Sequence, residues 1–285
     1  MAAGFFVLVL IGAALQDGGT RARVDASAVD HRPARAENPG SAPVDPSDAN
    51  AVVRRNTLYT EGGLANGNCP AKDLGDAGRQ EQTAFYRALM ECLNDEWRPL
   101  VENAGYSYEE PGLVVFDSPV DTPCGNASPE SGRTLAFYCP GDSVMYADVP
   151  QMRRFFGDDD VAYAIVIGHE FGHHVQQETG ILSAYDDLAH ADFESRLELN
   201  RRVELQASCM GGLFLGAIAE SFPMSDQRLS RLEQVAGSFG DEPGGGDDKR
   251  DHGSGASNRA WIFRGFDAND AETCNTFVVP AGQVE

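Results

Sequence analysis

The most informative segment of the chain is IVIGHEFGHHVQQE, residues 165–178, which contains the pattern His-Glu-x-x-His. On an α-helix, residues four apart lie on one face about 6 Å apart, so His169 and His173 can direct their imidazoles at one point. Two imidazoles at this spacing can bind one Zn²⁺ at about 2.0–2.1 Å. Glu170 lies about 100° further round the helix, where its carboxylate reaches a metal-bound water rather than the metal. The segment therefore predicts a zinc site with Glu170 as catalytic base.

The alternative is a buried helix in which the histidines are only structural. Three apolar residues at 165–167 lead directly into the motif, so its beginning is expected to be buried. Burial of two His and one Glu without a metal would leave several polar groups to satisfy, which is costly. Gly172 weakens a helix by about 1 kcal/mol relative to Ala, and such a glycine indicates close packing of another element. These features favour a metal site, whereas His174 lies off the shared face and is expected to be structural.

A catalytic zinc site needs a third protein ligand and an open fourth position. The residues after His173 lack the Gly and His with which metzincins continue the motif. His190 falls in a predicted loop and is a weak candidate. Glu194 and Glu198 share a predicted helix face with two arginines, so we expect them to be solvated.

Glu204 is the strongest candidate for the third ligand. It lies in VELQASCMGG, residues 203–212, where Ala207, Ser208 and Gly211 occupy its own helix face. Such small residues would let this helix approach the zinc helix closely enough for a carboxylate to reach the metal. We therefore predict Glu204 as the third metal ligand.

The chain begins with an apolar run, GFFVLVLIGAAL at residues 4–15, which no Lys or Arg precedes. The run is shorter than the ~20 residues of a membrane-spanning helix, so residues 1–15 are predicted to be a signal peptide, with a short membrane anchor as the alternative. Both place the rest of the chain outside the cytoplasm. Residues 16–55 are rich in Asp, Ala, Pro, Arg and Ser and are predicted to be a disordered linker. Residues 56–285 are expected to form the folded domain.

The six cysteines fit this location. None forms a Cys-x-x-Cys pair, so a thiolate zinc site is disfavoured, and an even number behind an export signal indicates three disulfides. We favour Cys69–Cys92 and Cys124–Cys139, because these pairs close short loops, and Cys209–Cys274.

The acidic composition argues against one class of partner. The formal net charge is −22, and no cluster of Lys and Arg is present to contact a phosphate backbone. The chain is therefore not expected to bind nucleic acid.

Apolar periodicity predicts both helices and strands. Helices are expected at residues 77–101, 159–178, 192–221 and 257–266. A strand is expected at 113–116, and a β-hairpin is expected from 133–139 and 143–147 around the turn Pro140-Gly141-Asp142. Strands followed by helices indicate an α+β domain.

Three blocks of sequence in order resemble the bacterial neutral zinc metallopeptidase family. They are GHEFGHHVQ (168–176), VELQASCMGG (203–212) and HGSGASNRAWIFRGF (252–266), which is followed by CNTF (274–277). The resemblance covers about residues 56–280. It implies a zincin-like fold with a small antiparallel or mixed sheet over the helix of the motif, and a sheet edge that binds extended peptide. It also implies His169, His173 and Glu204 as the zinc ligands and Glu170 as the base.

The chain departs from this family at Ser208, where related proteins commonly carry Asp. An acid there would orient a ligand, and the loss of such a partner typically weakens metal affinity or activity about 10–100-fold. A serine hydroxyl can still accept an imidazole N–H, so we expect weakening rather than loss.

An electrophilic group is expected to assist the developing oxyanion. His252, in the glycine-rich stretch HGSG, is the candidate, with Tyr163 and Tyr185 as alternatives. His252 could instead only cap the last helix.

The leading hypothesis is a secreted or anchored zinc peptidase that acts on peptides or proteins. The alternatives are a degenerate, zinc-stabilised extracellular binding module and a metal-free scaffold held by disulfides. Glu170 favours the enzyme over the module, because structural zinc has no use for a water-activating carboxylate beside it.

Overall fold

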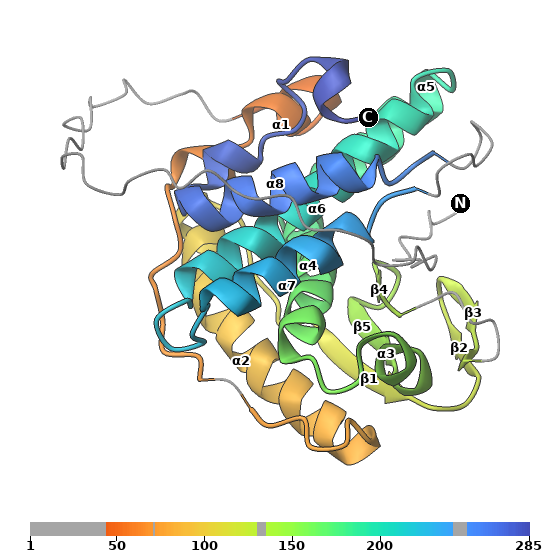
Figure 1. Ribbon diagram of the computed structural model, residues 1–285. Helices are drawn as coiled ribbons and strands as arrows, with labels where there is room; N and C mark the ends of the chain where they lie inside the picture. Colours follow the sequence, from red (N-terminus) through yellow and green to blue (C-terminus); the bar gives the residue numbers. More distant parts are fainter. Residues whose placement is uncertain (1–43, 71, 130–134, 242–249) are drawn as a thin grey trace, which may run out of the picture.

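The computed structural model describes residues 44–70, 72–129, 135–241 and 250–285 (Figure 1). The signal peptide or anchor predicted for residues 1–15 lies outside these ranges, and so do residues 16–43 of the predicted linker. Among the helices described, none combines the length and apolar character that a membrane span requires.

Two central helices carry the core of the molecule. The first is α4 (Asp160–Glu178), which is buried over most of its length, and the second is α6 (Arg196–Ala217). On its other side α6 packs against α8 (Gly255–Ala268), and α2 (Arg79–Asn103) and α7 (Asp226–Gly237) pack against α4. The four predicted helices are thus present, with shifts of a few residues at their ends.

A small mixed sheet lies beside α4. Its strand order is β1 (Gly112–Phe116), β5 (Val144–Asp148) and β4 (Ala136–Cys139). Strand β5 pairs parallel with β1 and antiparallel with β4, so β4 is an edge strand, and it contacts α4. The β4–β5 pair confirms the predicted hairpin and the α+β class. The remaining strands, β2 (Val120–Thr122) and β3 (Gly125–Ala127), form a separate ribbon, and α3 (Val149–Phe156) follows β5.

The linker predicted for residues 16–55 is wrong at its C-terminal end. Ala49–Arg55 form the helix α1, which buries Ala51, Val52 and Val53 against α5 (Ile181–Ala191). Asp48 caps α1 by accepting a hydrogen bond from the Ala51 N–H. This short apolar segment, which follows prolines and aspartates, is too short to show a helical period in the sequence. Its packing against α5 is what stabilises the helix.

Three disulfides join distant parts of the fold, and their pairing is the one favoured from the sequence. Cys69–Cys92 ties the N-terminal segment to α2, and Cys124–Cys139 ties the β2–β3 ribbon to β4. Cys209–Cys274 ties α6 to the C-terminal segment. Such disulfides are typical of proteins outside the reducing cytoplasm.

Small residues bring α4 and α6 into close contact, as their sequences predict. A Cβ atom on Gly172 would lie 2.8 Å from both Cα and O of Ala207, and one on Gly168 would lie 3.2 Å from Cα of Gly211. Backbone atoms cannot move aside as a flexible side chain can. The two glycines therefore set the distance between the helices.

Gly172→Ala is expected to lower the free energy of unfolding and to weaken metal binding, because it pushes α6 away from α4. Overpacking a tight core costs about 1–3 kcal/mol, and because the new Cβ would meet backbone atoms at 2.8 Å, we expect a cost above the roughly 1 kcal/mol that Ala gains over Gly within a helix. Urea unfolding and a zinc titration of the same preparation measure both effects. Gly282→Ala, where nothing lies within 4 Å of the added Cβ, is the matched control. Equal stability of the two variants would contradict the prediction.

Candidate metal centre

The structure brings the three predicted metal ligands together. His169 and His173 come from successive turns of α4, and Glu204 reaches them from α6. Glu204 Oε2 lies 3.2 Å from His169 Nε2 and 3.5 Å from His173 Nε2. One ligand atom from each residue lies within 4.8 Å of the others.

Burial and charge at this point suit a metal ion. All three side chains are buried, and His169 Nε2 and Glu204 Oε2 form no hydrogen bond with the described residues. Burial lowers the pKa of His169 to about 4, so its imidazole is neutral at neutral pH. Burial raises the pKa of Glu204, but His173, His252 and His169 together outweigh this and hold that pKa well below its usual value. Two imidazoles and one carboxylate are a donor set that zinc accepts, so these residues fit the metal.

Glu170 lies beside this group and is not one of the converging ligands. Its Oε2 accepts a hydrogen bond of 2.9 Å from the Tyr138 N–H of β4, and its buried Oε1 forms none with the described residues. Burial raises the pKa of Glu170 to about 8. A carboxyl group in this state can take up or release a proton near neutral pH.

His252 lies at the edge of the same site. Its Nε2 is 3.8 Å from Glu204 Oε2, its Nδ1 is 2.7 Å from Asp251 Oδ1, and its backbone N–H donates to Asp241 Oδ1. Burial disfavours the charged imidazole, but Glu204 and Asp251 outweigh this and raise its pKa to about 10. The cap of α8 is Ser254, so the alternative in which His252 caps the last helix is wrong.

The other candidates lie elsewhere or have other partners. The Tyr163 hydroxyl donates to Gly157 O before α4 begins, so its side chain is directed away from the ligands. Tyr185 lies nearer the site, since Glu204 and Asp251 both help to raise the pKa of its hydroxyl, which donates to Asn200 one turn before Glu204 on α6. His190 is exposed in α5, not in a loop, and Glu198 pairs with Arg202. His174 is buried against Tyr138 and is structural, as expected.

Comparison with known proteins agrees with this geometry. Residues 60–277 match the family described as "Putative neutral zinc metallopeptidase". The chain belongs to this family.

Two curated relatives illustrate the match. "Uncharacterized protein YpfJ" of Escherichia coli is 31% identical over 215 residues, which cover 69% of this chain and 72% of the relative. "Uncharacterized protein Rv2575" of Mycobacterium tuberculosis is 29% identical over 258 residues, which cover 81% of this chain and 83% of the relative. No solved structure matches the chain.

In this member of the neutral zinc metallopeptidase family, both histidines also have hydrogen-bond partners on their Nδ1 atoms. His169 Nδ1 lies 3.0 Å from Ser208 Oγ, so the expected hydrogen-bond contact between this serine and an imidazole is confirmed. His173 Nδ1 lies 2.8 Å from Gln176 Oε1. Gln176 was not predicted, although its position three residues after His173 on the same helix is a signal for such a contact.

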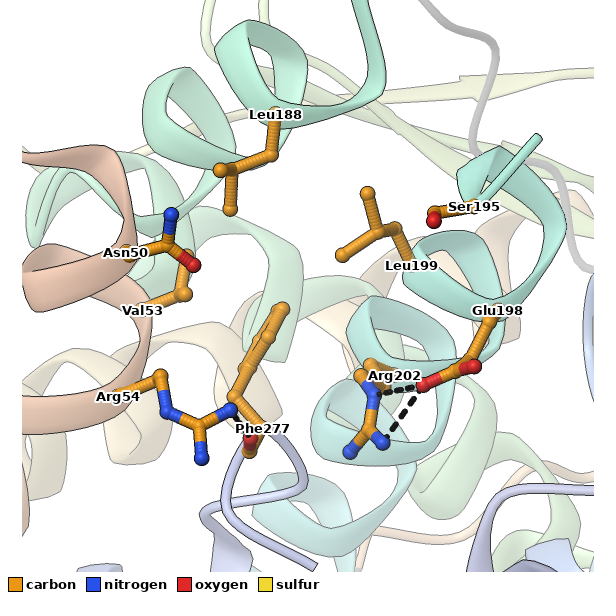
Figure 2. Close-up of a pocket in the computed structure, with 9 residues that line it drawn as sticks. All are labelled: Asn50, Val53, Arg54, Leu188, Ser195, Glu198, Leu199, Arg202 and Phe277. Atoms are coloured by element: carbon orange, nitrogen blue, oxygen red, sulfur yellow. Dashed lines mark hydrogen bonds and ion pairs between the residues drawn. The ribbon is translucent and has the colours of Figure 1, made fainter. Parts of the chain in front are cut away.

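A pocket of about 170 Å³ lies apart from the candidate metal site, between α1, α5, α6 and Phe277 (Figure 2). Two arginines line it, and each already has a hydrogen-bond partner. Arg202 pairs with Glu198 at 2.7 Å, and Arg54 donates to the backbone oxygen of Phe277. None of the metal-site residues lines this pocket.

Proposed function

We propose that the chain is a zinc-dependent peptidase in which His169, His173 and Glu204 hold the metal and Glu170 is the general base. The observation that carries the proposal is the convergence of three ligand atoms within 4.8 Å beside a buried carboxylate that is not a ligand. A site that only stabilises the fold would not need that fourth group. The name of the family supports both the metal and the reaction class.

The proton transfers fall to Glu170. Zinc bound here would lower the pKa of a coordinated water to about 7 and polarise a peptide carbonyl. Glu170 takes the proton from the attacking water and later delivers it to the departing amine. Burial raises the pKa of Glu170 to about 8 without a metal, and the charge of a bound zinc would lower it again, toward the range in which a carboxylate can accept a proton near neutral pH.

His252 is the proposed donor to the developing oxyanion. Glu204 and Asp251 favour its charged form in the metal-free site, and its side chain is 19% exposed, whereas the ligands are almost fully buried. Its imidazole can therefore contact a substrate that enters from solvent. Asp251 pairs with Nδ1 of His252, and Nε2 on the other side of the ring is directed at Glu204.

We propose the edge strand β4 as the place where an extended peptide binds, which requires its buried edge to open. Alternate residues of an antiparallel strand direct N–H and C=O away from the partner strand. The N–H of Tyr138 is directed away from β5 in this way, since it donates to Glu170. Ala136 lies two residues before Tyr138 on β4, so its N–H and C=O are directed to the same side. A peptide added along this edge would pass beside the metal ligands, which is a common mode of peptide recognition. We therefore propose peptides or proteins as substrates, bound by a zincin-like domain.

The proposed location is extracytoplasmic. The three disulfides support it. The apolar segment at residues 4–15 stays the proposed signal peptide or anchor. Nucleic acid is not among the proposed partners, because the net charge is −22.

Zinc analysis combined with a cleavage assay tests the function. The purified full chain is expected to hold about one zinc per chain, the stoichiometry of a site with three protein ligands and an open position. It should cleave members of a mixed peptide library, lose this activity to a chelator, and regain it with added zinc. Bound zinc without any cleavage would favour the binding module. A folded protein without zinc would favour the metal-free scaffold.

A further inference from the structure

We propose that Ser208, Asn258 and Gln176 are positioning residues that fix the proton of both ligand histidines on Nδ1. When the rings are neutral, each Nε2 is then the nitrogen left without a proton and can bind a metal beside Glu204. The inference rests on the proposed zinc site but not on peptidase activity. It follows from the direction of each hydrogen bond around the two rings.

The amide of Gln176 can have only one orientation. Its nitrogen lies 2.9 Å from Val203 O and 3.0 Å from Gln206 Oε1. A backbone carbonyl only accepts, so the NH₂ group of Gln176 must face Val203, and its oxygen must face His173. An amide oxygen only accepts as well. His173 Nδ1, at 2.8 Å, is therefore the donor.

The amide of Gln206, which is the next group in this chain of hydrogen bonds, also has only one possible orientation. Gln206 donates from its own nitrogen to Cys274 O and to the Tyr59 hydroxyl. Its oxygen therefore faces Gln176, where it accepts. Gln176 and Gln206 are fully buried, so no solvent competes for these bonds.

His169 is fixed by a second chain of bonds. Asn258 donates from its nitrogen to the backbone oxygens of His252 and Ser254, at 2.9 and 3.3 Å. These two oxygens only accept, so Asn258 Oδ1 faces Ser208, and the serine hydroxyl donates to it at 2.9 Å. With its single proton used there, Ser208 Oγ can only accept from His169 Nδ1.

The opposite tautomer would break this chain. If His169 carried its proton on Nε2, Ser208 would have to donate to Nδ1 and could no longer donate to Asn258. Asn258 Oδ1 would then lack a donor at a side chain that is 1% exposed, and an unsatisfied buried acceptor is costly. The proton on Nε2 would also block the position that a metal takes.

The second chain also links the ligand to the proposed oxyanion donor. Asn258 lies on α8 and holds the backbone of His252, while Ser208 lies on α6 and holds His169. One buried asparagine thus fixes both the imidazole of a ligand and the segment that carries His252. Where a carboxylate would orient a ligand through its charge, these neutral groups do so by the direction of their bonds.

Nitrogen NMR of the metal-free full chain, labelled with ¹⁵N in its histidines, tests the inference. Because Glu204 raises the pKa of His173, spectra are recorded at increasing pH until the ¹⁵N shifts of both rings no longer change, which marks the neutral form whose tautomer can be read. Both His169 and His173 are expected to carry the proton on Nδ1. Ser208→Ala should remove this preference at His169 alone, and Gln176→Met at His173 alone. Each should weaken zinc binding about 10–100-fold, as loss of such a partner typically does, and Ser208→Thr should restore it.

Matched controls separate positioning from general loss of stability. Ser221→Ala removes a hydroxyl in the turn after α6, and Gln82→Met removes a buried amide with four hydrogen bonds from α2. Neither should change a histidine tautomer or the zinc affinity. A proton on Nε2 of either ligand in the wild type would overturn the inference, as would an unchanged tautomer in Ser208→Ala. A wild type that binds no zinc overturns the proposed function instead, and the tautomer result still decides the inference.

Discussion

Glu170→Gln is expected to reduce peptide hydrolysis by about 10²–10⁴-fold and to leave the zinc content near that of the wild type. Glutamine keeps the size of the side chain, and its oxygen can still accept the Tyr138 N–H that Glu170 Oε2 accepts. It removes the proton affinity on which a general base depends. Since burial already disfavours the charged form of Glu170, a neutral replacement should not lower thermal stability. Initial rates on a cleaved peptide, zinc analysis and thermal unfolding measure the three effects.

Glu178→Gln is the control for this variant. Glu178 lies on the same helix, is partly exposed, and accepts a hydrogen bond from the Glu109 N–H, so its loss should leave the rate unchanged. A Glu170→Gln protein that cleaves as fast as the wild type would refute the mechanism. If the wild type and the variant both hold zinc and neither cleaves, the binding module becomes the better hypothesis.

The centre of the fold could be predicted because its sequence signals are local. The helix at 160–178 carries both histidines at the spacing of one turn, and the β4–β5 hairpin is marked by a Pro-Gly-Asp turn. Glu204 could be chosen over Glu194 and Glu198 because only Glu204 has small residues around it on its face. Those small residues are the ones that admit α4.

Elements that depend on distant packing could not be predicted. Helix α1 has seven residues and is stabilised by its contact with α5 and by the Asp48 cap rather than by its own propensity. The parallel pairing of β1 with β5 joins segments separated by the β2–β3 ribbon and β4. Nothing in either strand alone specifies that neighbour.

The hydrogen bonds around the metal ligands were only partly predictable. Ser208 is predictable from the resemblance to the family, because it stands four residues after Glu204, where related proteins commonly carry Asp. Asn258 contacts it from 50 residues away, so no spacing rule could have paired them. His252 was placed near the site by its block of sequence, yet its distance from Glu204 depends on how α8 packs on α6.

Glu204→Gln is expected to remove zinc and activity together. Glutamine has nearly the same shape, but a neutral amide oxygen is a poorer zinc ligand than a carboxylate. The charge of Glu204 also favours the protonated forms of His173 and His252, because it raises the pKa values of both. The loss of zinc affinity should therefore exceed the about 10–100-fold effect of losing a group that only orients a ligand. Competition with a chelator of known affinity measures it, and peptide hydrolysis should fall in parallel.

Glu198→Gln is the control on the same helix. It removes a carboxylate that pairs with Arg202 outside the metal site, so zinc content and activity should not change. The contrast between the two variants assigns the roles. Loss of a base, in Glu170→Gln, leaves the zinc bound, whereas loss of a ligand, in Glu204→Gln, removes the zinc as well. Added zinc in excess should restore part of the activity of Glu204→Gln but none of that of Glu170→Gln. If Glu204→Gln keeps its zinc at wild-type affinity, the third ligand is another residue, and the convergence of the three side chains has a different cause.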